Sequence, residues 1–141
     1  MDLWLSHPAT VHIPLALSVI LPLAFLATWG GITFKWLSPN SWYFPVAGIW
    51  LLAGSSLMAY FTGERAKVFS AADQVLLKSH ESIAQFYLIF GAALFFLSTA
   101  LVYLQFSRFR RMLCILIFIV LLAQAGVALR LGHIGGEIVF G

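Results

Sequence analysis

The chain has few charged residues and a single cysteine, and each shortage excludes a class of protein. Asp, Glu, Lys and Arg make up 9% of the 141 residues, whereas soluble domains carry about 25%. So few charges cannot cover the surface of a small domain in water. The lone cysteine, Cys114, excludes an intramolecular disulfide and therefore a disulfide scaffold. Hydrophobic residues make up 62% of the chain, which excludes an intrinsically disordered protein.

Four long apolar runs account for this composition. They cover residues 11–29, 45–61, 83–104 and 112–131. A helix of about 20 apolar residues crosses the hydrocarbon layer of a bilayer, which is about 30 Å thick. No linker or repeat divides the chain. The sequence therefore predicts an all-α fold, an integral membrane four-helix bundle in which residues 1–141 form a single domain.

Basic residues are concentrated in two short connections between these runs. Lys35 lies in the first connection, and Arg108, Arg110 and Arg111 lie in the third, with no acidic residue in either. Lys and Arg in short loops stay on the cytoplasmic side of a membrane. We therefore expect a multi-pass protein of the cell inner membrane with both termini in the periplasm. The formal charge of +3 then reflects membrane orientation, and no nucleic-acid partner is expected.

The connection between the second and third runs is longer and faces the periplasm in this orientation. Over residues 64–78, apolar side chains recur at helical spacing among charged ones. This pattern predicts a short amphipathic helix that lies on the membrane surface or packs on the bundle.

Four histidines carry most of the functional information: His7, His12, His80 and His133. His7 and His12 open the first span, His80 opens the third, and His133 closes the fourth. Because an even number of crossings separates them, all four lie near the outer face of the membrane. Ionisable residues at membrane depth are costly and usually turn toward partners inside a bundle. This clustering predicts a site for a cofactor or a metal ion.

The surroundings of the histidines favour haem b, one or two per chain, held by axial imidazoles. No carboxylate lies near them within the apolar runs, and no cysteine accompanies them. Helix bundles commonly hold haem between facing helices through histidine. All four histidines are therefore candidate ligands for the cofactor or its metal. Arg65 and Arg130 lie on the same side of the membrane and are candidates to pair with haem propionates.

Other interpretations stay open at this stage. A periplasm-facing copper or zinc site would use the same histidines, because imidazole suits both metals. In a cofactor-free structural subunit, they would hydrogen-bond within the bundle or to a neighbouring protein, and a lone helix-end histidine such as His7 often has such a role. Gln85, Gln124 and Ser55 are polar residues inside the spans. Interhelical hydrogen bonds are their default role, and contact with a quinone is the alternative.

No motif assigns a catalytic residue. The chain has no Cys-x-x-Cys, no His-Glu-x-x-His and no glycine-rich phosphate loop after a strand. Serines adjoin two of the histidines in sequence, but adjacency does not establish the geometry of a catalytic triad. An electron-carrier subunit therefore fits the sequence better than an enzyme that acts alone.

Several short motifs occur in a recognisable order. They are His-Pro at 7–8, Val-His-Ile-Pro at 11–14, Thr-Gly-Glu at 62–64, His-Glu at 80–81 and Gly-His-Ile-Gly-Gly-Glu-Ile-Val at 132–139. Together they resemble a family of small four-helix prokaryotic membrane domains catalogued as domain-of-unknown-function family 2231. The resemblance covers essentially the whole chain. Each motif is short, and it is their order and spacing that make the resemblance specific.

The resemblance implies a role beside redox proteins. Members of this family often occur near or fused to Rieske or cytochrome c domains, which implies haem b and electron transfer at the outer face of the membrane. The family's recurrent positions correspond here to His7, His12, Glu64, His80, His133, Gly135 and Gly136. The chain ends at Gly141, where relatives carry further residues or a soluble redox domain. The expected partners are therefore the lipid bilayer, a separate periplasmic redox protein or other membrane subunits, and a quinone.

Overall fold

Four long helices make up most of the protein. The computed structural model describes the backbone of residues 3–66, 74–104 and 106–140, and the side chains of residues 10–63, 74–104 and 106–137. The helices are α1 Leu3–Thr33, α2 Tyr43–Ala66, α3 Gln74–Leu104 and α4 Arg110–Phe140. A short 3-10 helix, Pro39–Trp42, precedes α2.

All four helices are long and apolar enough to cross a membrane, which confirms the predicted number and order of long apolar helices. Helices α1, α3 and α4 each contain 31 residues and therefore measure about 46 Å. This length exceeds the hydrocarbon layer of about 30 Å, so their ends extend into the interfacial region. The helices are longer than the apolar runs because they continue through polar residues at their ends.

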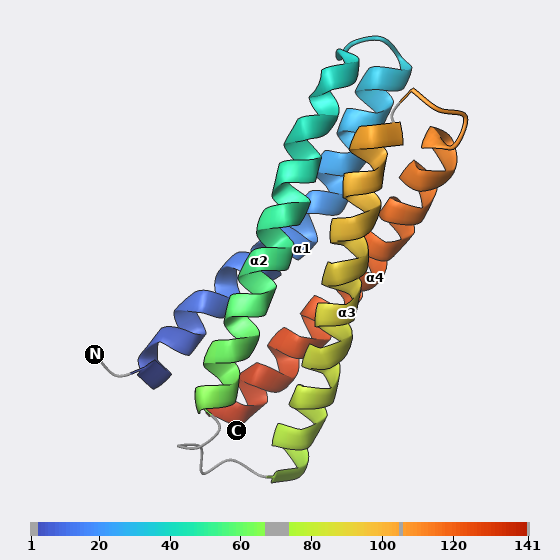
Figure 1. The fold of residues 1–141 in the computed structure, drawn as a ribbon. Helices are drawn as coiled ribbons and strands as arrows, with labels where there is room; N and C mark the ends of the chain where they lie inside the picture. Colours follow the sequence, from blue (N-terminus) through green and yellow to red (C-terminus); the bar gives the residue numbers. More distant parts are fainter. Residues whose placement is uncertain (1–2, 67–73, 105, 141) are drawn as a thin grey trace.

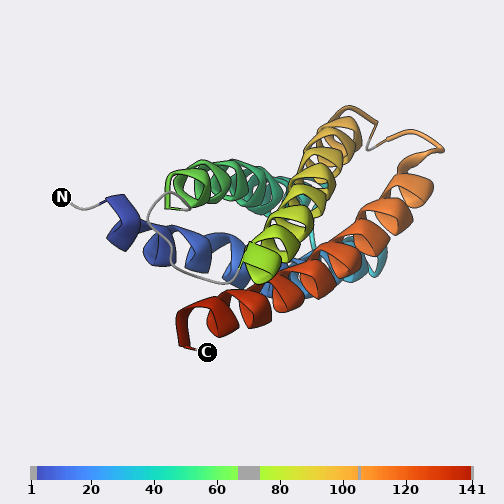
Figure 2. The same ribbon diagram turned by 90° about the horizontal axis from the view of Figure 1, so that it is seen from below.

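The helices form an up-and-down bundle. Each packs against two neighbours in the ring order α1, α2, α3, α4 (Figure 1). Helices α1 and α3 are therefore diagonal across the bundle and run in the same direction, as the end-on view shows (Figure 2). The starts of α1 and α3 and the ends of α2 and α4 lie at one end of the bundle, which we call the histidine end. The opposite end carries Lys35 and Arg108, and we call it the basic end.

The size and polarity of the buried side chains change along the bundle axis. Toward the basic end it is filled by large, fully buried apolar side chains: Phe25, Ile49, Leu52, Leu94, Leu101, Ile117 and Leu121. Trp42 closes this end, with its ring centroid 5.2 Å from that of Phe25. Toward the histidine end many of the buried residues are small or polar, among them Ser56, Ala59 and Ala128. Among the side chains that the structure describes, the buried ones are therefore smaller and more polar toward the histidine end.

The outward faces of the helices are also apolar. Large residues such as Leu23, Phe96 and Leu129 are largely exposed on the isolated chain. In water this surface would drive aggregation, whereas lipid tails solvate it. The exposed apolar surface therefore agrees with a multi-pass membrane protein.

Lys35 ends α1 in an unusual backbone conformation. Its φ is +63°, in the left-handed region that favours glycine. The amide of Trp36 donates to the Gly31 carbonyl at 2.8 Å, and the amide of Lys35 donates to the Ile32 carbonyl at 3.2 Å. These two bonds form a Schellman motif, in which a left-handed residue satisfies the last carbonyls of a helix. The connection to α2 therefore turns sharply at the single basic residue that it contains.

The segment predicted to form a short amphipathic helix has a different structure where it is described. Residues 64–66 are the last residues of α2, and residues 74–78 are the first residues of α3. Residues 67–73 lie outside the described residues. The described parts of this segment thus extend the spanning helices, which satisfies their backbone groups within the helix. The expectation of a separate helix over 64–78 therefore does not hold for these parts.

Candidate functional site

His80 turns toward the interior of the bundle at the histidine end. Its side chain is half-buried and lies against α4, because a Cβ placed on Gly135 would be 3.6 Å from His80 Cε1. A Cβ at position 135 would therefore be in ordinary van der Waals contact with the imidazole, which places His80 close to the backbone of α4.

The register of α3 explains why His80 points inward. This helix buries Tyr87, Gly91, Leu94 and Ser98, which share one face at spacings of three, four and seven residues. His80 stands seven residues before Tyr87, which is two helical turns, and it continues the same stripe. The imidazole therefore reaches the space between the helices at the level where the core becomes small and polar.

Tyr87 fixes how α3 sits against the diagonal helix α1. Its hydroxyl donates to the Pro14 carbonyl at 2.9 Å and lies 2.6 Å from Ser18 Oγ. Ser18 Oγ also donates to the Pro14 carbonyl at 2.8 Å. The two contacts of the Tyr87 hydroxyl are buried and join the third span to the first, whereas the bond from Ser18 to Pro14 lies within α1. They set Tyr87 and Pro14 at matching depths in the bundle.

The same contact relates His80 to position 7. His7 stands seven residues before Pro14, and His80 stands seven residues before Tyr87. Because α1 and α3 run in the same direction, each position lies two turns, or about 10 Å along its own helix, nearer the histidine end than the Tyr87–Pro14 contact. The first turns of α1 lean away from α3 (Figure 1). Position 7 also shares the register of the buried residues Pro14 and Ser18. The side chain of His7 lies outside the described residues.

His12 lies on another face of α1. It is exposed, and five residues separate it from position 7, which is a rotation of about 140° on an ideal helix. Nearby, Thr10 Oγ1 lies 3.0 Å from Thr62 Oγ1 of α2, so α1 and α2 are held together close to this end. His12 therefore faces away from the space that His80 enters.

His133 also faces outward. Its side chain is 75% exposed, and its Nε2 lies 3.4 Å from Glu137 Oε1, one turn further along α4. Arg130, one turn earlier, is exposed and lies beside α3 on the outside of the bundle. The buried face of α4, with Gln124 and Ala128, is on the other side of the helix. His133 and Arg130 thus share a surface, whereas His80 lies inside.

The predicted ligand set is therefore only partly brought together. His80 points inward, position 7 is in register with it, and His12 and His133 point outward. The side chain of Arg65 lies outside the described residues. Among the residues whose side chains are described, no group of three or more His, Cys, Asp or Glu could hold a metal ion.

A buried polar cluster adjoins this region. The Tyr87 hydroxyl lies 2.6 Å from Ser18 Oγ, and the side chains of Ser56 and Gln124 are close to it. Gln124 is fully buried, and neither its Oε1 nor its Nε2 makes a hydrogen bond to another described residue. Gly91 lies against it, since a Cβ at position 91 would be 4.0 Å from Gln124 Nε2. The middle of the bundle thus contains an unpaired amide next to a hydrogen-bonded tyrosine.

Sequence reasoning singled out Gln124 but missed Tyr87 and Ser18. Gln85 is exposed, and Ser55 donates to the Leu52 carbonyl of its own helix at 3.1 Å. A usable signal was present, because Tyr87, Gly91 and Ser98 repeat at helical spacing and small or polar residues tend to face neighbouring membrane helices.

No protein-family model, no curated protein and no solved structure matches the chain. The resemblance to family 2231 therefore stays a prediction.

Proposed function

We propose that this protein is a haem b-binding electron-transfer subunit of a membrane redox complex, in which His7 and His80 would hold the haem. The observation that carries the proposal is the register between α1 and α3. The hydrogen bond from Tyr87 to Pro14 relates positions 7 and 80, which lie at equal distances beyond it on diagonal helices. Helix bundles commonly hold haem through histidines on different helices.

The placement of His80 supports the proposal. Its imidazole is half-buried and lies against the backbone of α4 at Gly135, and Ala59 and Ala128 are small buried residues on the two flanking helices. His12 and His133 do not fit a group held inside the bundle, because their side chains are exposed. Of the four candidate histidine ligands, the proposal therefore keeps two, His7 and His80.

Haem, when bound, supplies a reversible one-electron carrier whose potential depends on its axial ligands and on burial. The protein contributes the rest of the function through its own residues. His80 and His7 bind and orient the group, and Tyr87 holds their two helices in register. The densely packed apolar core around Phe25 and Leu121 keeps water and ions from the basic end. Electrons would therefore enter and leave near the histidine end.

We propose that the histidine end faces the periplasm in the cell inner membrane. The opposite end carries all the basic residues of the two short connections, with no acidic residue there, and such connections are retained in the cytoplasm. The electron partner would then be a periplasmic carrier or a quinol. The outward-facing His12 and the His133–Glu137 pair are suited to contact a neighbouring subunit.

Optical spectroscopy tests the proposal directly. The full chain, expressed with ample haem and purified in detergent, is expected to show b-type absorption bands after reduction with dithionite. His7→Ala and His80→Ala should each lose most of the bound haem. His12→Ala and His133→Ala are matched controls that remove an imidazole from the same end of the bundle, and they should retain it.

A cavity variant separates ligation from a structural role. His80→Gly should lose haem, and added imidazole should restore the bands by entering the space that the side chain leaves. A colourless wild-type protein after expression with ample haem would refute the proposal. The ligand assignment would be wrong if His80→Ala kept full occupancy while His12→Ala or His133→Ala lost it.

A cofactor-free structural subunit is the second candidate. The outward placement of His12 and His133 favours it, because exposed polar residues on a membrane helix suit contacts with a partner protein. This candidate predicts that the purified chain is colourless and free of metal by elemental analysis. The spectrum and the metal content together decide between the two functions, and stoichiometric copper or zinc without porphyrin would instead indicate a metal-binding protein.

A further inference from the structure

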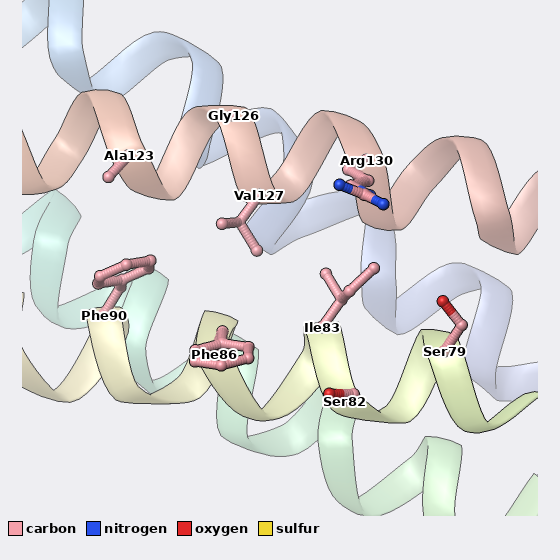
Figure 3. Close-up of a pocket in the computed structure, with 9 residues that line it drawn as sticks. All are labelled: Ser79, Ser82, Ile83, Phe86, Phe90, Ala123, Gly126, Val127 and Arg130. Carbon is pink, nitrogen blue, oxygen red and sulfur yellow. The ribbon is translucent and has the colours of Figure 1, made fainter.

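A groove runs along the outside of the bundle between α3 and α4, on the half nearer the histidine end. Its volume is about 660 Å³, and its walls come from both helices. Ile83, Phe86 and Phe90 line it from α3, and Val127 and Arg130 line it from α4 (Figure 3). Its lining is mainly apolar, and it opens on the surface that faces lipid.

The groove is polar at one end only. Figure 3 shows Ser79 and Arg130 together at one end, and Phe90 and Ala123 at the other. Because α3 starts at the histidine end and α4 finishes there, the polar end lies toward the membrane surface. The groove thus has the polarity of a lipid, with a charged group near the interface and apolar walls toward the bilayer centre.

The length of the groove matches one leaflet. Ser79 and Phe90 are eleven residues apart on α3, which corresponds to about 16 Å along the helix. Half of a hydrocarbon layer of about 30 Å is nearly the same distance. An acyl chain of the leaflet on the histidine side would therefore reach from the interface to the end of the groove.

Arg130 carries a positive charge at the polar end of the groove. Among the described residues, no carboxylate forms an ion pair with it. The groove has no acidic residue in its lining. Glu137, the nearest carboxylate along α4, interacts with His133, and no ion pair joins it to Arg130. A guanidinium group at membrane depth is costly without an anionic partner, and it binds phosphate oxygens through paired hydrogen bonds.

We infer that this groove binds an anionic phospholipid, with one acyl chain between α3 and α4 and the phosphate on Arg130. The positive charge of Arg130 favours a ligand with an anionic headgroup over a quinone. A quinone head is neutral and would leave Arg130 without a counter-charge, whereas a phosphate supplies one. The inference is independent of the proposed haem, because the groove lies on the outer surface of the bundle and His80 lies inside.

Native mass spectrometry of the full chain in detergent tests this site. Phosphatidylglycerol is titrated against phosphatidylcholine with the same acyl chains. We expect phosphatidylglycerol to bind more tightly, and Arg130→Gln to lower its affinity about fivefold, since one basic residue near a lipid headgroup contributes about 1 kcal/mol. Binding of phosphatidylcholine should change little in this variant.

Two further variants control for charge and for fold. Lys78→Gln removes an exposed cation from the same end of α3, outside the lining of the groove, and should leave the affinity unchanged. Gly126→Leu keeps Arg130 but fills the groove, and it should weaken phosphatidylglycerol binding. No described side chain comes within 4 Å of a Cβ at position 126, so this substitution is compatible with the fold.

Three outcomes would overturn the inference. Equal affinity for the two phospholipids would show that the headgroup charge does not matter. Equal losses in Arg130→Gln and Lys78→Gln would show a general attraction to the basic surface. Displacement of phosphatidylglycerol by ubiquinone, with the same dependence on Arg130, would identify a quinone as the occupant.

Discussion

Replacement of Gln124 by methionine is expected to stabilise the protein, which is unusual for a change in a packed core. The side chain is fully buried in the middle of α4, beside Tyr87 and Gly91. Neither its Oε1 nor its Nε2 finds a hydrogen-bond partner among the described residues. Methionine has a similar length and volume and needs no such partner, so Gln124→Met removes an unpaired amide without leaving a cavity.

The size of the effect follows from three terms. A buried polar group without a partner costs about 1–3 kcal/mol. A swap that conserves volume costs less than about 1.5 kcal/mol. The unfolded chain within a membrane also finds partners for its polar groups, which reduces such differences to about 0.6 kcal/mol on average for interhelical hydrogen bonds. We therefore expect Gln124→Met to raise the free energy of unfolding by about 1 kcal/mol.

The chain carries its own probe of unfolding. Cys114 is the single cysteine, and it is fully buried between the helices. A thiol-reactive dye should label it only when the bundle opens, so the labelling rate in detergent at increasing temperature or dodecyl sulfate fraction reports stability. Gln124→Met should shift the labelling transition to harsher conditions. Leu121→Met is the matched control, because it places methionine at a fully buried apolar position of the same helix and should lower stability slightly.

A loss of stability in Gln124→Met as large as that in Leu121→Met would refute the reasoning. That result would mean that the amide of Gln124 is satisfied in the protein, by an internal water or by a bound group. Both variants place methionine at a fully buried position of α4, so the comparison separates the loss of the amide from the effect of the methionine side chain.

Two more predictions concern the register and the orientation of the helices. Tyr87→Phe removes the hydroxyl that contacts Pro14 and Ser18 and should lower the free energy of unfolding by about 1 kcal/mol in the same labelling assay; an unchanged transition would show that this contact does not hold α1 against α3. Alkaline phosphatase fused after Gly141 should be active in a bacterial host, because it folds only in the periplasm, and activity only of a cytoplasmic reporter at that position would reverse the proposed orientation.

The apolar runs predicted the four spans correctly but not the ends of the helices. Hydrophobic length alone identifies a membrane helix, whereas a helix ends where its backbone groups find other partners. The Schellman motif at the end of α1 has Lys35, with a φ of +63°, at the position where glycine is usual. The sequence therefore gives no signal for it. The segment 64–78 shows the same limit, since its described parts continue α2 and α3 as helix.

At the candidate site, the sequence predicts the level of the histidines but not the direction of their side chains. The parity of the membrane crossings is enough to expect His80 and His133 near the same face. Their side chains differ in direction, because one continues the buried stripe of α3 and the other lies opposite the buried face of α4. Hydrophobicity does not distinguish these cases, since helices in a bilayer are apolar on their lipid-facing and core-facing sides alike. Only the spacing of small and polar residues such as Tyr87, Gly91 and Ser98 indicates the buried face of α3.

The sequence by itself determined that four helices are long and apolar enough to cross a membrane, and in which order they follow one another. Both follow from the lengths and the order of the apolar runs, because the stability of a single helix in lipid depends on its own hydrophobic length and not on its neighbours. Only the tertiary structure decided how far each helix is rotated about its axis, because that rotation depends on contacts such as Tyr87 with Pro14 and His80 with Gly135. The inward direction of His80 and the outward directions of His12, Arg130 and His133 therefore emerged only when the four helices were packed together.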